Sequence, residues 1–228
     1  MSSRGSTIVL CALLAVLVAG WLAWRNVASA RKTQDPPVHV TKQPVNFATR
    51  TFDPASFPAD MPPLGAGEAA VCDSNFSSSA SVAGTLHPTD GAHATMTVRR
   101  VDVTLQLNVT IWVPNGASQH VIEHEEGHRE ISEYYYKTAD KLAERIAETY
   151  VGRQVPIAGG DLNTASSTAL HQLATEFTDD YGKELNPDPA QQLYDSITDH
   201  SRNSTDAKNA ASVAIKNVEM TATHTSGN

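Results

Sequence analysis

The sequence is poor in basic residues, with 17 lysines and arginines against 25 aspartates and glutamates and a formal net charge of −8. Proteins that bind nucleic acids need a basic surface for the phosphates, so this composition excludes that class. With 228 residues, of which 40 % are hydrophobic, the chain is long enough for one compact domain with extensions.

Cysteine is almost absent. Cys11 lies within the N-terminal apolar run, which leaves Cys72 alone in the rest of the chain. A membrane or a cleavage event would separate the two thiols, so no internal disulfide is expected. Cys72 is predicted to be a small buried residue, and a role as a metal ligand is the less favoured alternative.

Charge is also absent from Thr7–Trp24. A cleaved signal peptide fits the basic start, the apolar run and the small residues Ala28–Ala30. An uncleaved membrane anchor fits the length of the run and the tryptophans at positions 21 and 24. Residues 1–30 are therefore predicted to be a signal peptide or an N-terminal anchor. Either one exports the remaining chain, which would be periplasmic, secreted or anchored to the inner membrane through residues 7–24.

Proline is concentrated near the N-terminus, where seven of the twelve prolines lie between Pro36 and Pro63. Prolines so spaced disfavour helix and sheet, so residues 31–67 are predicted to be an extended linker. Residues 68–204 are predicted to form the domain. The polar, alanine-rich residues 205–228 are predicted to be a flexible tail.

The first half of the predicted domain has the pattern of β-structure. Every odd position from Val101 to Val113 is apolar, which predicts a half-buried strand. The alternation changes phase at Arg99–Arg100, which indicates a bulge. An earlier strand is expected around residues 77–86.

The second half is predicted to be helical. One helix is expected from Ser118, as N-cap, to about Val151 without a break, and a second from about Thr164 to Leu185. The expected fold is α+β and zincin-like, with a small antiparallel sheet followed by a long active-site helix and the second helix.

The first predicted helix contains the motif H-E-x-x-H at His124, Glu125 and His128. Two histidines four residues apart share a helix face and can bind one zinc ion, while the glutamate acts as general base on water. Gly127 lies within the helix at a cost of about 1 kcal/mol relative to alanine, which indicates a close approach to the backbone there. Peptidases of this type hold extended substrates along an edge strand, and a long strand directly precedes this helix.

A zinc site needs a third protein ligand. The metzincin pattern would place glycine at position 131 and histidine at position 134, where this chain has Ile131 and Tyr134. In an unbroken helix, Glu148 would lie about 30 Å from His128, too far to share a metal ion. Three nearer residues are also excluded, because Glu130 and Glu133 point away and His120 lies about 12 Å along the axis. The ligand is therefore expected beyond the helix, where His171 and His200 are the available histidines.

Two motifs resemble a bacterial family of predicted secreted zinc-dependent proteases (domain of unknown function 922). The first is HEEGHREISE from His124, and the second is YDSITDHSRN from Tyr194. The resemblance spans about Glu68 to Asn203, and Ser201 stands where the family usually has glycine. It implies His200 as the third zinc ligand, with His171 in a structural role. Tyr194 is then a candidate for polarising the scissile carbonyl, and Asp195 for orienting a ligand histidine.

The sequence thus predicts a zinc-dependent metallopeptidase of the cell envelope that acts on peptides or proteins. His124, His128 and His200 would hold Zn²⁺, and Glu125 and Tyr194 would be catalytic. Two alternatives stay open. One is a non-catalytic exported envelope protein in which the same residues hold a metal ion, and the other is a domain without metal.

Overall fold

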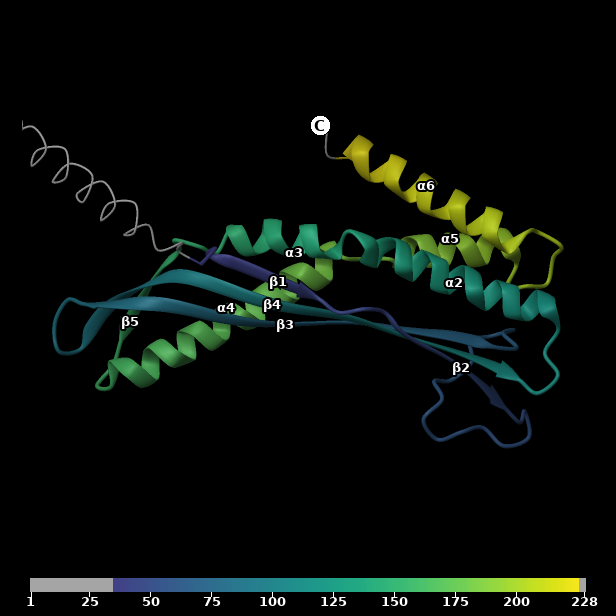
Figure 1. Ribbon diagram of the computed structural model, residues 1–228, viewed down its shortest axis with the longest axis horizontal. Coiled ribbons are helices and arrows are strands. Elements are labelled where there is room, and N and C mark those ends of the chain that lie inside the picture. The colour runs from purple at the N-terminus through teal and green to yellow at the C-terminus, as the bar shows by residue number, and fades with distance from the viewer. Residues whose placement is uncertain (1–34, 226–228) are drawn as a thin grey trace, which may run out of the picture. The chain divides into compact units, whose positions relative to one another are not determined.

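The structure, a computed structural model, describes residues 35–225. Its strands are β1 (Val38–Lys42), β2 (Asn46–Phe52), β3 (Val71–Pro88), β4 (His93–Pro114) and β5 (Gln154–Ala158). Its helices are α2 (Gln119–Lys137), α3 (Ala139–Glu148), α4 (Leu162–Glu184), α5 (Asp188–Thr198) and α6 (Ala207–Thr225). The predicted α+β class is therefore confirmed (Figure 1).

The predictions for residues 1–30 fall outside the described part of the chain. Within residues 35–225, no helix combines the length and the hydropathy needed to cross a bilayer.

The sheet is built around β4. Along one edge, β4 pairs antiparallel with β3, from Ala94 to Trp112. Along the other edge it pairs antiparallel with β5 and parallel with β1 and β2. The prediction of an antiparallel sheet is therefore right for β3, β4 and β5 and wrong for β1 and β2. Strands β1 and β2 precede the β3–β4 hairpin in the sequence. They run parallel to β4 and pair with the edge of β4 that does not face β3 (Figure 1).

The prediction of a linker over residues 31–67 is wrong for residues 38–52, which contain β1 and β2, whereas residues 53–67 form no helix or strand. The prolines lie before β1, between β1 and β2, or after β2, so none interrupts a ladder. Val38, Val40 and Val45 pack against the main core, which gives this segment apolar area to bury. One compact unit begins at Pro37 and includes β1, β2 and α6, which lie outside the predicted domain of residues 68–204.

Strand β4 has the predicted alternation. Its odd residues from Val101 to Val113 are buried, and the register against β3 shifts where Ala83 pairs with Arg100 and Gly84 with Val98. The bulge predicted at Arg99–Arg100 is thus confirmed. Helices α3 and α4 both contribute to the main core cluster with this face of β4, so they cover the same face of the sheet.

The predicted helix from Ser118 to Val151 is divided at Thr138, between α2 and α3. Ser118 is the N-cap, as predicted, and its hydroxyl accepts a hydrogen bond from the Val121 amide. At the other end of α2, the Lys42 ammonium donates to the Lys137 carbonyl at 2.7 Å. A side chain from β1 thus satisfies a carbonyl at the helix end, which supports the break.

The prediction of a flexible tail over residues 205–228 is wrong for α6. Its alanines at positions 207, 210, 211 and 214 are buried in a cluster with Ile131, Ala190 and Tyr194. Small side chains on one face let α6 lie close to α2 and α5 (Figure 1). Helix α6 therefore packs against α2, which carries the H-E-x-x-H motif, and against α5.

Candidate metal centre

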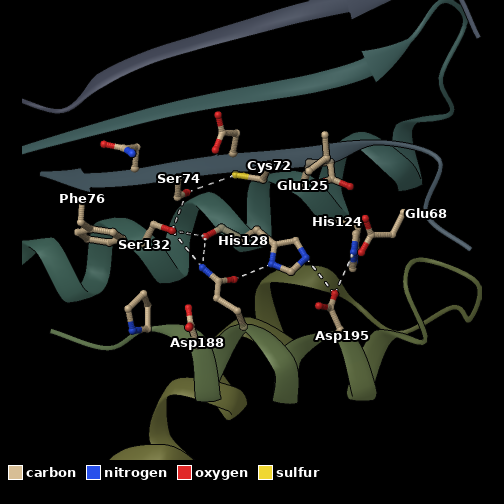
Figure 2. A pocket seen from close by; sticks show the side chains of 15 residues that line it. Glu68, Cys72, Ser74, Phe76, His124, Glu125, His128, Ser132, Asp188 and Asp195 are labelled. Carbon is tan, nitrogen blue, oxygen red and sulfur yellow. Dashed lines mark hydrogen bonds and ion pairs between the residues drawn. The ribbon is translucent and has the colours of Figure 1, made fainter. Parts of the chain in front are cut away.

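The two motif histidines lie one turn apart on α2 and face α5. His124 is buried at 4 % exposure, and the centroids of the His124 and His128 rings are 4.8 Å apart. The Asp195 carboxylate approaches both rings from α5 (Figure 2). Its Oδ1 atom lies 3.0 Å from His128 Nε2 and 3.4 Å from His124 Nε2.

These three donors meet the requirements of a metal site. His124, His128 and Asp195 can each offer one ligand atom, with all three atoms within 4.8 Å of one another. Burial alone would raise the pKa of the Asp195 carboxyl, but the contacts with the two histidines hold it well below its usual range. The carboxylate therefore stays charged and available as a ligand. Two imidazoles and one carboxylate form a donor set that zinc accepts.

His200 reaches the same carboxylate from another direction. Its Nδ1 atom lies 3.7 Å from Asp195 Oδ1 and 3.6 Å from Glu68 Oε1, in a second group that shares Asp195 with the first. His200 therefore lies near the histidine pair, and the third member of the donor group that contains this pair is Asp195. The backbone places His200 there with three successive residues at positive φ, from Asp199 to Ser201.

Buried polar atoms without a hydrogen bond mark the same place. Among the described residues, the atoms concerned are His124 Nδ1, Asp195 Oδ1 and His200 Nδ1. Such atoms are costly in a folded protein unless an ion or water satisfies them. All three residues, His124, Asp195 and His200, belong to the two groups that can hold a cation. The residues present therefore fit a metal ion.

Glu125 projects from the same turn of α2 towards β3, near Cys72 (Figure 2). Its side chain is buried at 4 % exposure. Burial raises the pKa of the Glu125 carboxyl to about 7, the charges of Glu68 and Asp195 add to the effect, and the charge of His128 opposes it. A carboxyl with this pKa can accept and release a proton near neutral pH.

Tyr194 does not line the cavity, so its position does not favour the predicted role of polarising the scissile carbonyl. Its side chain is fully buried, and its hydroxyl donates to the His124 carbonyl at 2.9 Å. The ring stacks on His124 with centroids 5.0 Å apart. The hydroxyl also lies against Gly127, at the close approach to the backbone that the sequence indicated. Tyr194 therefore holds the motif in place.

The site opens into a cavity of about 560 Å³ between β3, α2 and α5. The wall on the β3 side is formed by residues 71–76, and the opposite wall contains Pro187, Asp188, Gln191 and Asp195. In the described part of the chain, β3 pairs only with β4, so its other edge has no partner strand. The edge strand beside the site is thus β3, and the expectation that the strand directly before the helix holds the substrate is wrong, because β4 is the central strand.

The remaining predicted candidates lie elsewhere. The His120 ring nitrogen lies 2.7 Å from the Asn203 carbonyl, and His171 is exposed on α4. Glu148 ends α3 and does not line the cavity.

Two residues at the site had no sequence signal, namely Glu68 and Gln191. Glu68 stands in the loop before β3, and Gln191 carries no metal-ligand chemistry of its own. Only the packing of α5 on α2 brings Gln191 to the motif.

No protein-family model, curated protein or solved structure matches this chain. The resemblance to secreted zinc-dependent proteases therefore stays a prediction, and the geometry of the site supports the proposal that follows.

Proposed function

We propose that this protein is a zinc-dependent metallopeptidase in which His124, His128 and Asp195 hold the metal ion. The observation that carries the proposal is the convergence of these three donor groups, within 4.8 Å of one another, at an open cavity that Glu125 also lines. A catalytic zinc site uses three protein ligands and keeps one position open. The resemblance implies His200 as the third ligand. In our proposal Asp195 is the third ligand, and His200 lies beside Asp195.

In this proposal each side chain has a separate task. A bound zinc ion supplies Lewis-acid activation of water and of the scissile carbonyl. Glu125 takes a proton from the attacking water and passes it to the leaving amine, which its raised pKa of about 7 allows. Tyr194 fixes His124 through the backbone bond and the ring stack.

The shape of the site favours an extended peptide as substrate. The free edge of β3 lies beside the cavity that contains Glu125, and an extended chain can add to such an edge through backbone hydrogen bonds. An edge strand facing a helix with the H-E-x-x-H motif is also the zincin-like arrangement, which we propose for this fold.

A non-catalytic metal-binding protein is the second candidate. His200 Nδ1 and Glu68 Oε1 lie close enough to Asp195 to join a metal shell from the open side. Structural zinc sites are closed by four protein ligands. If His200 closed the site, the protein would bind zinc without hydrolysing peptides.

We propose an exported location in the cell envelope for either function. This rests on the apolar, uncharged run at residues 7–24 and the small residues that follow it.

The decisive experiment compares Glu125→Gln with Glu123→Gln, an exposed position on the same helix. Hydrolysis of casein and of a quenched fluorescent peptide library would be measured with one equivalent of zinc. Glu125→Gln should bind zinc normally and lose activity by about 100-fold or more, because it lacks the general base. Glu123→Gln should match the wild type. Equal activity of Glu125→Gln and the wild type would contradict the mechanism, and zinc binding without any hydrolysis by the wild type would favour the second candidate.

A further inference from the structure

Gln191, on α5, makes three hydrogen bonds to α2. Its Oε1 atom lies 2.6 Å from His128 Nδ1. Its Nε2 atom donates to the His128 carbonyl at 3.1 Å and to the Ser132 hydroxyl at 3.0 Å. Ser132 is fully buried and lies 2.8 Å from the Ser74 hydroxyl on β3. The side chain of Gln191 thus links α5, which carries it, to α2.

The chemistry of these partners allows one orientation of the amide. A backbone carbonyl only accepts hydrogen bonds, so the NH₂ group of Gln191 must face the His128 carbonyl. The amide oxygen then faces the His128 ring, and because this oxygen only accepts, Nδ1 must carry a proton. The other ring nitrogen, Nε2, is the one directed at Asp195.

We propose that Gln191 is a positioning residue that fixes the tautomer and the ring orientation of His128, so that Nε2 is its metal-binding atom. This inference rests on the proposed zinc site. Metal-bound histidines are commonly held in this way through the nitrogen that does not bind the metal, and loss of such a partner typically weakens metal binding by about 10- to 100-fold.

The two histidines of the motif are held by different means. His128 is held by the Gln191 hydrogen bond, whereas His124 Nδ1 has no hydrogen-bond partner among the described residues. The His124 ring is held by stacking on Tyr194 instead. Removal of the Gln191 amide should therefore affect His128 and leave His124 in place.

The test compares Gln191→Met with Gln192→Met. Methionine keeps the length and unbranched shape of the side chain and removes the amide, and Gln192 is an exposed neighbour on the same helix. In metal-free protein, ¹⁵N-detected imidazole spectra should show a protonated His128 Nδ1 in the wild type and in Gln192→Met. In Gln191→Met this proton should exchange with solvent. The zinc dissociation constant should rise about 10- to 100-fold in Gln191→Met and stay within about twofold in Gln192→Met.

The two readouts separate this inference from the proposed function. If the wild type binds zinc and Gln191→Met binds it equally well, the positioning role is wrong and the zinc site stands. If His128 Nδ1 carries no proton in the wild type, the inferred tautomer is wrong whatever the metal affinity. If the wild type binds no zinc, the proposed function is contradicted, while the Nδ1 signal still decides whether Gln191 fixes the ring.

Discussion

The Tyr194 hydroxyl occupies the space that a side chain at position 127 would need. A Cβ atom on residue 127 would overlap the Tyr194 hydroxyl and the ring carbon that bears it. Tyr194 is fully buried between α2 and α6, so it has no room to withdraw. Because Gly127 has no side chain, it leaves room for Tyr194, which holds His124 in place.

Gly127→Ala should therefore destabilise the protein, although alanine is the better helix former. Forcing a methyl group into packed space typically costs about 1–3 kcal/mol. The free energy of unfolding, measured in urea, should fall by this amount. Gly182→Ala is the matched control, because Gly182 lies in α4 and faces open space where the alanine methyl group would go. It should be stabilised by up to about 1 kcal/mol. A Gly127→Ala protein as stable as the wild type would contradict the close contact.

Tyr194→Phe tests whether the hydroxyl is structural or catalytic. The variant removes one of the hydrogen bonds to the buried His124 carbonyl, so the free energy of unfolding should fall by about 0.5–1.5 kcal/mol. The kcat of zinc-loaded Tyr194→Phe should stay close to that of the wild type, because the hydroxyl does not reach the cavity. A fall in kcat of about 100-fold or more with unchanged stability would instead indicate a catalytic acid.

Asp195→Ala and His200→Ala distinguish the two candidates for the third ligand. Asp195 lies against both histidines of the motif, whereas His200 contacts Asp195. Zinc binding, measured by competition with a chelator, should weaken by more than about 100-fold in Asp195→Ala. In His200→Ala it should weaken by about tenfold, the lower end of the range for partners of metal ligands. His171→Ala, on the exposed face of α4, should bind zinc like the wild type. A larger loss in His200→Ala than in Asp195→Ala would make His200 the ligand.

The sequence was sufficient for those elements whose local pattern agrees with their environment. The alternation along β4, the bulge at Arg99–Arg100 and the H-E-x-x-H helix all follow from the spacing of apolar residues. Helix α4 also forms where the second helix was predicted, and it buries Leu173, Phe177 and Tyr181. In each case the residues that must be buried repeat at the period of the element itself.

The errors arose where distant segments decide the structure. Strands β1 and β2 lie between prolines, and their partner is β4, some sixty residues later in the chain. Helix α6 is rich in alanine and polar residues, and its order comes from the close packing of those alanines on α2 and α5. Asp195 and His200 both belong to the second motif. Asp195 faces the histidine pair from α5, whereas His200 lies in the left-handed turn that follows this helix.

Alkylation of Cys72 gives a pH-dependent test of the packing along β3. Cys72 lies at the cavity, where burial raises the pKa of its thiol to about 12, although the contact with the Ser74 hydroxyl opposes this. The thiolate is the reactive form, and an unfolded cysteine has a pKa of about 8.5. In a Cys11→Ser protein, the rate of reaction with iodoacetamide should therefore keep rising about tenfold per pH unit up to pH 10. The same protein in urea should reach a plateau near pH 9. A plateau below pH 10 in the folded protein would show that Cys72 is more solvated than in this structure.

The turn that carries His200 predicts a stabilising substitution. Asp199, His200 and Ser201 have φ values of 50°, 50° and 62°, a left-handed conformation that residues with a Cβ atom adopt at a cost. Ser201→Gly removes this cost at the position where the resembling family usually has glycine, and should raise the free energy of unfolding by about 0.5–1 kcal/mol. Ser196→Gly is the matched control, because Ser196 is exposed within α5 and should lose stability through the poor helix propensity of glycine. Both values would be measured by urea denaturation of metal-free protein, so that a change in zinc affinity does not contribute. If Ser201→Gly lost as much stability as Ser196→Gly, residue 201 would not be left-handed, and His200 would not be held beside Asp195 by this turn.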